Sequence, residues 1–99
     1  MREKLMMIFT KEELNRISEN GHTITVDLHG LIVRDAKRLL NNLMVLNRDG
    51  YDICAIHGYN HGTAIKEMIR GTLGNPRLSS KKSVNGNYGR TVLKMQKAA

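Results

Sequence analysis

The sequence predicts an α/β fold of two layers, in which a four-stranded sheet carries two helices on one face. Three observations predict it. Alternating residues at 23–29 and an apolar run at 51–56 are typical of strands. Helical periodicity follows each of them, at 33–48 and 63–73. A length of 99 residues, with 40% hydrophobic and 25% charged residues, suits one compact domain.

The first element is a short helix predicted within residues 10–20. Thr10 and Glu13 have the spacing of a capping box, in which each side chain bonds the other residue's backbone N–H. Gly21 is placed as a C-terminal stop. We expect residues 1–21 to form an N-terminal extension and residues 22–99 to form the main domain.

The strand at 23–29 has one apolar and one polar side. Ile24, Val26 and Leu28 share the first side, as expected when one face of a strand packs on a core. Gly30 ends this strand. The polar side predicts that one face of the sheet stays partly open.

The remaining elements alternate between helices and strands. Apolar residues recur every three or four positions at 33–48, and this helix ends at the turn-forming pair Asp49 and Gly50. A buried strand, a helix and two final strands follow, at 51–56, 63–73, 77–84 and 90–96. The predicted order is helix and then β-α-β-α-β-β.

This order places two loops at the same edge of the sheet. A strand, helix, strand unit makes parallel strands with a right-handed connection. Parallel strands have their C-terminal ends at one edge, so Asp27–Gly30 and His57–Gly62 should emerge side by side, each next to a helix N-terminus. Ligands of open α/β sheets usually bind at this edge.

The net charge of +7 comes from one segment of the chain. Residues 1–69 hold equal numbers of basic and acidic residues, whereas residues 70–99 hold seven Lys and Arg and no acid. This imbalance favours a polyanionic partner, such as RNA or DNA. A solvated surface that keeps a small protein soluble is the alternative.

The one cysteine and the apolar segments limit the class of protein. Cys54 lies in an apolar run and is expected to be a small buried residue, so no disulfide partner is expected. No stretch is long and apolar enough for a membrane span or a secretory signal. We expect a cytoplasmic protein with no membrane partner.

The loop His57–Gly62, with the sequence HGYNHG, is predicted to hold an anion. A loop at a helix N-terminus offers unpaired N–H groups and the positive end of the helix dipole. Gly58 and Gly62 permit close approach of the backbone, and Asn60 tolerates a left-handed conformation. Phosphate is the natural ligand, although a tight loop without a ligand would have the same pattern.

Asp27, His29 and His57 are expected to converge on this loop. Two imidazoles and a carboxylate suit phosphodiester cleavage, because one group takes a proton from the nucleophile and another protonates the leaving oxygen. With RNA the neighbouring 2′-hydroxyl could attack and no cofactor is required; with DNA a water attacks, and a divalent cation, Mg²⁺ or Mn²⁺, becomes more plausible. Two alternatives stay open: histidines that only bond nearby backbone, and a metal site made of these three residues.

Three blocks of the sequence resemble the small MutS-related domain, known as the Smr domain. They are VDLHGLIVRDAKRLL, IHGYNHGTAIKEMI and NYGRTVLKM, in that order, and the resemblance runs from about Ile24 to Met95. The family's Leu-Asp-x-His motif corresponds to Val26–His29, with valine in place of leucine. Its His-Gly-x-Gly-x-Gly loop corresponds to His57–Gly62, with Asn60 in place of the central glycine.

The resemblance implies a two-layer sandwich like the C-terminal domain of bacterial initiation factor three. Its mixed sheet has the strand order 1-2-4-3, and the fourth strand is antiparallel to the others. Family members are nucleic-acid-binding modules, several with endonuclease activity on DNA or RNA. They occur in MutS-like ATPases, in ribosome-rescue proteins, or alone, and this chain resembles the stand-alone form.

We therefore expect an endonuclease that acts on RNA or on structured or branched DNA. Asp27 and His29 would be the catalytic pair, and His57 a second proton-transfer or phosphate-contacting group. The expected phosphate cradle is Gly58, Tyr59, Asn60 and Gly62. The side chains expected to hold the nucleic acid are Lys66, Arg77, Lys81, Lys82 and Arg90, with Arg34, Lys37 and Arg38 extending the track and Tyr59 and Tyr88 stacking on bases.

Two other classes of function are compatible with the sequence. The first is an adaptor without chemistry that docks on ribosomal or messenger RNA, with affinity that depends steeply on salt. The second is a module that binds an acidic protein and has no affinity for polynucleotides.

Overall fold

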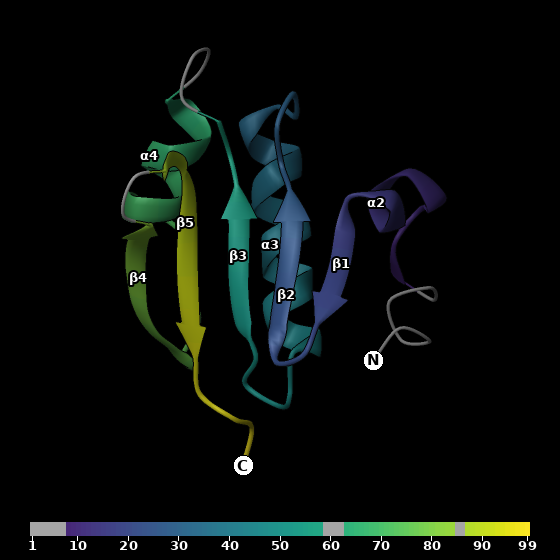
Figure 1. Cartoon of the computed structure of the whole chain (residues 1–99), viewed down its shortest axis with the longest axis vertical. Coiled ribbons are helices and arrows are strands. Elements are labelled where there is room, and N and C mark those ends of the chain that lie inside the picture. Colours follow the sequence, from purple (N-terminus) through teal and green to yellow (C-terminus); the bar gives the residue numbers. More distant parts are fainter. Residues whose placement is uncertain (1–7, 59–62, 85–86) are drawn as a thin grey trace.

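The computed structural model describes residues 8–58, 63–84 and 87–99 and confirms the predicted α/β class (Figure 1). A mixed five-stranded sheet carries helices on one face. The elements in chain order are α2 (Lys11–Asn15), β1 (Ile17–Asn20), β2 (Thr23–Asp27), α3 (Val33–Leu46), β3 (Asp52–Ile56), α4 (Ala64–Gly71), β4 (Leu78–Val84) and β5 (Asn87–Met95).

The strand order is β1-β2-β3-β5-β4. β2 and β3 are parallel, as the helical crossover between them requires, and β5 is antiparallel to both β3 and β4. The last four strands in the chain therefore have the predicted order 1-2-4-3. β1 is a fifth strand that the sequence analysis does not predict, and it pairs antiparallel with β2 at the edge.

The predicted helix over 10–20 is wrong beyond Asn15. The capping box is present, because the Glu13 N–H donates to Thr10 Oγ1 at 3.1 Å and the Thr10 N–H donates to Glu13 Oε1 at 2.9 Å. The chain then turns, and residues 17–20 form β1, with Ile17 buried. Pairing with β2 satisfies backbone groups that would otherwise line an open sheet edge.

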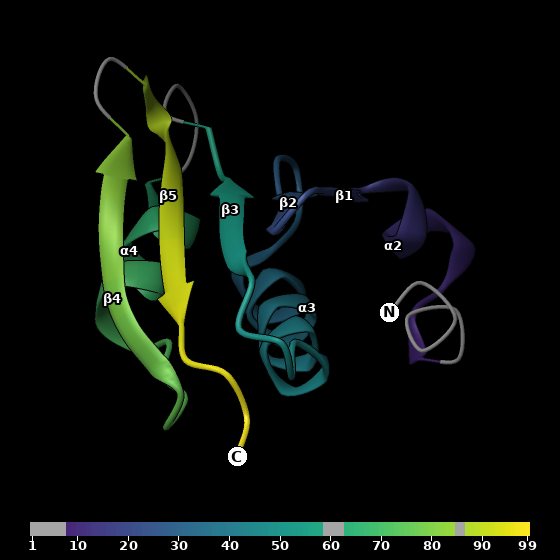
Figure 2. The same cartoon turned by 60° about the horizontal axis from the view of Figure 1, so that its bottom comes forward.

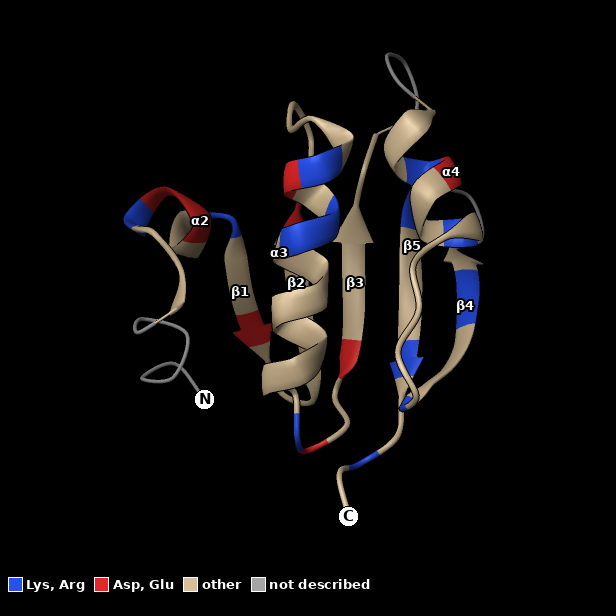
Figure 3. Cartoon of the chain, turned by 180° about the vertical axis from the view of Figure 1, so that it is seen from behind, with Lys and Arg blue, Asp and Glu red and all other residues tan. Residues whose placement is uncertain are grey.

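Both long helices pack on the same face of the sheet (Figures 2 and 3). The apolar stripes of α3 and α4 meet the inward side chains of β2, β3 and β5. The buried residues of this core include Ile24, Val26, Ala36, Leu39, Leu40, Leu43, Met44, Ile53, Ala55, Ile65, Met68, Ile69 and Leu93.

The other face of the sheet is not covered by a described helix, and we call it the open face (Figure 2). The strand registers place the complementary set of side chains on it, because residues in register point to the same side. Lys94 and Asp52 form an ion pair across it at 2.7 Å. The open face includes Thr23, Thr25, Asp27, Cys54, Ile56, Lys82, Arg90, Val92 and Lys94.

The turn between α3 and β3 lies at the opposite end of the sheet from the C-termini of β2 and β3. Asn47 is fully buried, and its side chain bonds the N–H and the carbonyl of Tyr51 at 2.9 and 2.7 Å. Gly50 has a φ of 71°, and a Cβ there would come within 2.7 Å of the Lys97 backbone nitrogen. These contacts explain why the helix ends at Leu46.

Cys54, the one cysteine of the sequence, is buried with a free thiol. Among the helices in the described residues, none combines the length and the apolar character that crossing a membrane requires.

Candidate nucleic-acid interface

The C-terminal ends of β2 and β3 lie side by side, with Asp27 in register with Ile56 (Figure 1). The start of β5 joins them, because the N–H groups of His57 and Gly58 donate to the Gly89 carbonyl at 2.8 and 3.1 Å. We call this edge the upper rim, and it consists of Asp27–Gly30, His57–Gly58 and Gly89.

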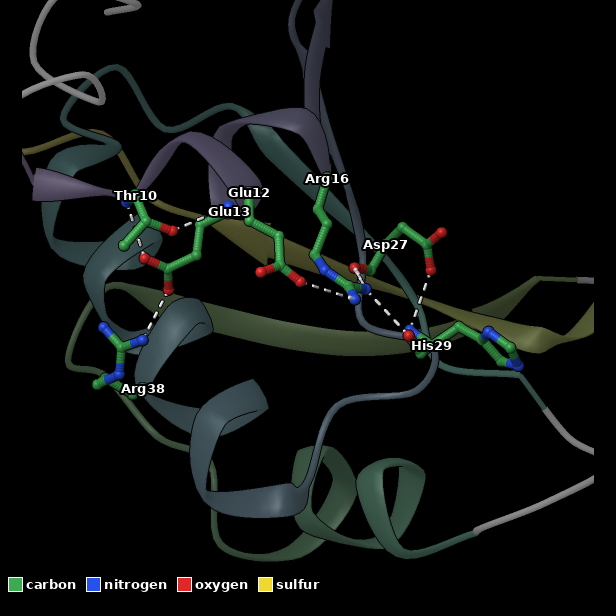
Figure 4. A network of polar contacts seen from close by, with 7 residues as sticks. All are labelled: Thr10, Glu12, Glu13, Arg16, Asp27, His29 and Arg38. Atoms are coloured by element: carbon green, nitrogen blue, oxygen red, sulfur yellow. Dashed lines mark hydrogen bonds and ion pairs between the residues drawn. The ribbon is translucent and has the colours of Figure 1, made fainter.

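The carboxylate of Asp27 and the imidazole of His29 are exposed at the upper rim (Figure 4). Asp27 Oδ1 accepts a hydrogen bond from the His29 backbone N–H at 3.0 Å, which fixes the turn just after β2. The His29 ring makes no hydrogen bond to another described residue. Both side chains therefore keep polar atoms for a ligand.

His29 also lies against the second histidine-containing segment. Gly58 has a φ of 75°, and a Cβ at that position would lie 3.4 Å from His29 Cδ2. The imidazole thus lies within van der Waals contact of this position, and the positive φ would strain any residue other than glycine there. Asp27, His29 and Gly58 are consequently neighbours at one rim.

His57 lies in the interior of the protein, with only 2% of its surface exposed. Its Nδ1–H donates to the Gly58 carbonyl at 2.8 Å, so the uncharged ring accepts a hydrogen bond from Thr91 Oγ1 at Nε2, at 2.9 Å. Burial lowers the pKa of His57, the bond to Gly58 opposes this, and the charges of Lys66 and Arg70 lower it further. The ring is therefore neutral at pH 7 and holds Gly58 in place.

The position of His57 predicts that stability falls as the pH drops below about 6.5, the ordinary pKa of histidine. The folded-state pKa of His57 is lowered, so the unfolded chain takes up a proton in this window while the folded chain does not. Protonation of the unfolded state lowers the free energy of unfolding until the folded-state pKa is reached. The measurement is urea unfolding at several pH values between 7.5 and 5.

The matched variants for this measurement are His57→Gln and His22→Gln, because His22 is an exposed histidine. His57→Gln should be less stable at pH 7.5 and should have a flatter dependence on pH than the wild type. His22→Gln should keep the wild-type slope. An unchanged slope in His57→Gln would contradict the assignment of His57 as the buried neutral group.

Part of the predicted phosphate cradle lies outside the described residues. Gly58 is described, whereas Tyr59, Asn60 and Gly62 are not, and the same holds for the side chain of Tyr88. The helices α3 and α4, which both begin near the upper rim, are described. An open groove of about 400 Å³ runs between their N-termini, with Gly30–Val33 on one side, Ala64–Ile65 on the other, and His57 between them.

Both helices begin at this groove without a side-chain cap. The N-cap residues, Ile32 of α3 and Thr63 of α4, make no capping hydrogen bond to the first turn. Among the described residues, the N-cap side chains therefore leave the first N–H groups of each helix without a capping partner, and the positive ends of two helix dipoles face one region. An anion in the groove could accept from both.

Two of the predicted nucleic-acid-binding cations bond the protein's own main chain. Arg77 donates to the carbonyls of Met44 and Asn47 at 2.6 and 2.7 Å and so caps the C-terminus of α3. Lys81 donates to the Leu73 carbonyl, just after α4, at 2.7 Å. Cations at helix C-termini satisfy unpaired carbonyls and the negative end of the dipole. We assign Arg77 and Lys81 to the scaffold.

The three predicted cations of α3 have different surroundings. Arg38 forms an ion pair with Glu13 of α2 at 2.7 Å. The side chain of Arg34 is 85% exposed, 3.7 Å from Asp35. Lys37 forms no hydrogen bond or ion pair with another described residue. Arg34 and Lys37 are thus available to a ligand, whereas Arg38 has an internal partner.

Lys66, Lys82 and Arg90 make no hydrogen bond or ion pair with another described residue. They lie on α4, β4 and β5, where basic residues gather (Figure 3). Arg90 is in register with Ile56, which is in register with Asp27, so Arg90 lies about 10 Å from Asp27 on the open face by the spacing of strands. These cations could hold a backbone that passes the upper rim.

The described residues contain no group of three or more His, Cys, Asp or Glu side chains that could hold a metal ion. Asp27 and His29 alone could supply two ligands. The Asp27 carboxylate is exposed, and one of its oxygens makes no hydrogen bond to another described residue, so it could share a divalent cation with a phosphate.

Two residues that build this site, Thr91 and Arg16, are not indicated by any local sequence pattern. The Thr91 hydroxyl donates a hydrogen bond to His57 Nε2, and the Arg16 guanidinium donates to the carbonyls of Asp27 and His29. The contact of Thr91 depends on the register of β5 against β3, which no local pattern indicates. The contact of Arg16 depends on β1, which the helical interpretation of residues 10–20 hides.

The fold is similar to one known from a crystal structure, the Smr domain of Thermus thermophilus MutS2. The TM-score is 0.63 at 25% sequence identity, and the match covers 73% of this chain and 96% of that domain. Neither a protein-family profile nor a curated protein matches the sequence. The resemblance in the sequence and the likeness in structure thus point to the same domain.

Proposed function

Because the chain carries an Smr-like domain, we propose that it binds RNA or structured DNA along the upper rim and cleaves a phosphodiester bond there. One observation carries the proposal: Asp27 and His29 are exposed at the upper rim, where the His29 ring lies next to Gly58 and where α3 and α4 begin. Such a site offers proton-transfer groups beside a place for a phosphate.

The uncapped N-termini of α3 and α4 support a phosphate in the groove between them. Backbone N–H groups and helix dipoles bind phosphate without regard to base sequence, so this contact would position the substrate and would not select a sequence. Lys66 from α4 and Arg90 from β5 would bind the neighbouring phosphates. Apolar Ile32 and Ile65 at the groove would limit access of water on that side.

In the proposed reaction, the free carboxylate oxygen of Asp27 takes the proton of the attacking hydroxyl. The new phosphorus–oxygen bond forms while the bond to the leaving oxygen breaks, and protonated His29 gives that oxygen its proton. With RNA the attacking group is the adjacent 2′-hydroxyl, and with DNA it is water. His57 acts by holding the Gly58 segment, since both of its ring nitrogens are engaged inside the protein.

The second candidate function is an adaptor that binds RNA, such as ribosomal or messenger RNA, without cleaving it. The internal bonds of His57 favour this alternative, because they leave two proton-transfer groups instead of three at the rim. A cytoplasmic location suits both functions, and the free buried thiol of Cys54 suits a reducing compartment.

The experiment that separates the two functions uses labelled single-stranded RNA, duplex DNA and branched DNA. Each substrate is incubated with the protein in Mg²⁺, in Mn²⁺ and in EDTA, and products are resolved on a denaturing gel. We expect cleavage of RNA or branched DNA. Cleavage that continues in EDTA would show that the reaction needs no divalent cation. If the protein binds the substrates but forms no products, the adaptor function is supported, and if it binds none of them, both functions are wrong.

Substitution of the free cations should weaken binding and reduce its dependence on salt. Lys66→Gln, Lys82→Gln and Arg90→Gln should each lower the slope of log affinity against log salt by roughly 0.7 to 0.9, the value for one phosphate contact. The measurement is fluorescence anisotropy of a labelled oligonucleotide at four salt concentrations.

Arg48→Gln is the matched control, since Arg48 is exposed and lies in the turn at the opposite end of the sheet. It removes the same charge and should leave the slope nearly unchanged. An equal loss of slope in Arg48→Gln would mean that net charge, and not the upper rim, governs binding.

A further inference from the structure

Arg16, the residue between α2 and β1, contacts both ends of the turn that carries Asp27 and His29 (Figure 4). Its Nη1 donates to the Asp27 carbonyl at 3.1 Å and to the His29 carbonyl at 2.9 Å. The Arg16 carbonyl in turn accepts the Asp27 N–H at 2.8 Å. The main chain of this turn is therefore held at three points by one residue.

The two Nη1 contacts use both hydrogens of that nitrogen. The other terminal nitrogen, Nη2, lies 3.9 Å from a Glu12 carboxylate oxygen, and the Arg16 side chain is 23% exposed. The guanidinium is thus largely enclosed and occupied by the protein itself. It is poorly placed to bind a substrate phosphate and well placed to fix the two carbonyls relative to each other.

The helix that precedes Arg16 is fixed as well. The capping box of Thr10 and Glu13 stabilises its first turn, and the Glu13 carboxylate forms an ion pair with Arg38 of α3 at 2.7 Å. The segment α2–β1 is consequently attached to the sheet on one side and to α3 on another. The Glu13 side chain takes no part in the three contacts between Arg16 and the turn.

We propose that Arg16 is a positioning residue for the cleavage reaction, through the distance and orientation that it sets between the Asp27 carboxylate and the His29 imidazole. The inference depends on the proposed function. The segment α2–β1 would then fix the geometry of the upper rim, in addition to pairing with the edge of β2. A displacement of reacting groups by about 1 Å can lower a rate by about 100-fold, so loss of this clamp should be visible in the chemical step.

The test compares Arg16→Met and Arg16→Lys with the wild type on the substrate that the wild type cleaves. Arg16→Met should lower kcat by roughly 10- to 100-fold with little change in KM. Arg16→Lys retains the charge but lacks the planar fork of donors, so it should recover only part of the rate. Circular dichroism and thermal unfolding of each variant check that the fold is retained.

Glu13→Ala is the matched structural control. It removes the ion pair between α2 and α3 but touches neither Asp27 nor His29. It should lower the melting temperature and leave kcat unchanged. If Arg16→Met lowers kcat no more than Glu13→Ala does, Arg16 is only a structural residue and the inference is wrong.

Two further outcomes would also overturn the inference. A rise in KM with unchanged kcat in Arg16→Met would make Arg16 a substrate-binding residue. Absence of cleavage by the wild type itself would overturn the proposed function, and with it the role of Arg16. The wild-type reaction thus separates failure of the inference from failure of the function on which it depends.

Discussion

Asp27→Asn should reduce the single-turnover rate of cleavage by about 10²- to 10⁴-fold, the range for a positioned proton-transfer group. Asparagine has nearly the same size, and its Oδ1 can still accept the His29 N–H that aspartate accepts at 3.0 Å. The turn after β2 should therefore keep its shape. What the variant loses is the carboxylate that takes the proton of the nucleophile.

Single-turnover cleavage and affinity are measured in parallel for this variant. Affinity measured in EDTA should not fall, because removal of a negative charge near a phosphate does not weaken its binding when no cation bridges the two groups. Asp52→Asn is the matched control: it is the same change on the open face, at the opposite end of β3, where Asp52 pairs with Lys94. It should cleave at the wild-type rate. If Asp27→Asn and the wild type had equal single-turnover cleavage rates, Asp27 would have no role in the chemical step.

Arg77→Met should lower the free energy of unfolding by roughly 2 to 4 kcal/mol, because hydrogen bonds from a charged group to partly buried carbonyls contribute strongly. The variant leaves the carbonyls of Met44 and Asn47 without their donor at the end of α3. For a domain of this size, the melting temperature should fall by about 10 °C or more. Differential scanning calorimetry measures the change.

Lys82→Met is the control for Arg77→Met, because Lys82 is exposed on β4 and has no described partner. It should leave stability nearly unchanged and weaken nucleic-acid binding, whereas folded Arg77→Met should bind as well as the wild type. If Arg77→Met were as stable as the wild type but bound nucleic acid poorly, Arg77 would be a binding residue and not a residue of the scaffold. The pair thus separates a basic residue of the scaffold from one available to a ligand.

Much of the fold follows from periodicity alone. The apolar spacing after Val33 and the Asp49–Gly50 pair predict α3 to within two residues of its end at Leu46. β1 could not be predicted in the same way, because four residues are too few to establish a period of two. Thr10 and Glu13 correctly indicate the start of a helix, but a capping box carries no information about where the helix ends.

The closeness of the two histidine-containing segments also follows from the sequence, because parallel strands end at one edge of a sheet. The burial of His57 could not be predicted in this way. It results from Thr91 and Gly89 of β5, which reach His57 only through the antiparallel register of β5 and β3. An exposed and a buried histidine at strand ends have the same local pattern, so only the three-dimensional pairing distinguishes His29 from His57.

The basic composition of residues 70–99 indicates a polyanion but not which cations contact it. Arg77 and Lys81 lie in the same charged segment as Lys82 and Arg90. The first two face carbonyls at helix ends, whereas the other two lie on the open face. The number of basic residues in a segment therefore exceeds the number available to a ligand wherever some of them cap helix C-termini.

The central claim is that the upper rim receives the scissile phosphate, and amide chemical-shift mapping tests it most directly. The experiment titrates ¹⁵N-labelled protein with a short single-stranded RNA that carries a non-cleavable 2′-O-methyl group. We expect the largest shifts at His29, Gly58 and Arg90, with no change at Gly50 or Tyr51. Shifts confined to the end of the sheet that holds Gly50, with the upper rim unaffected, would contradict it.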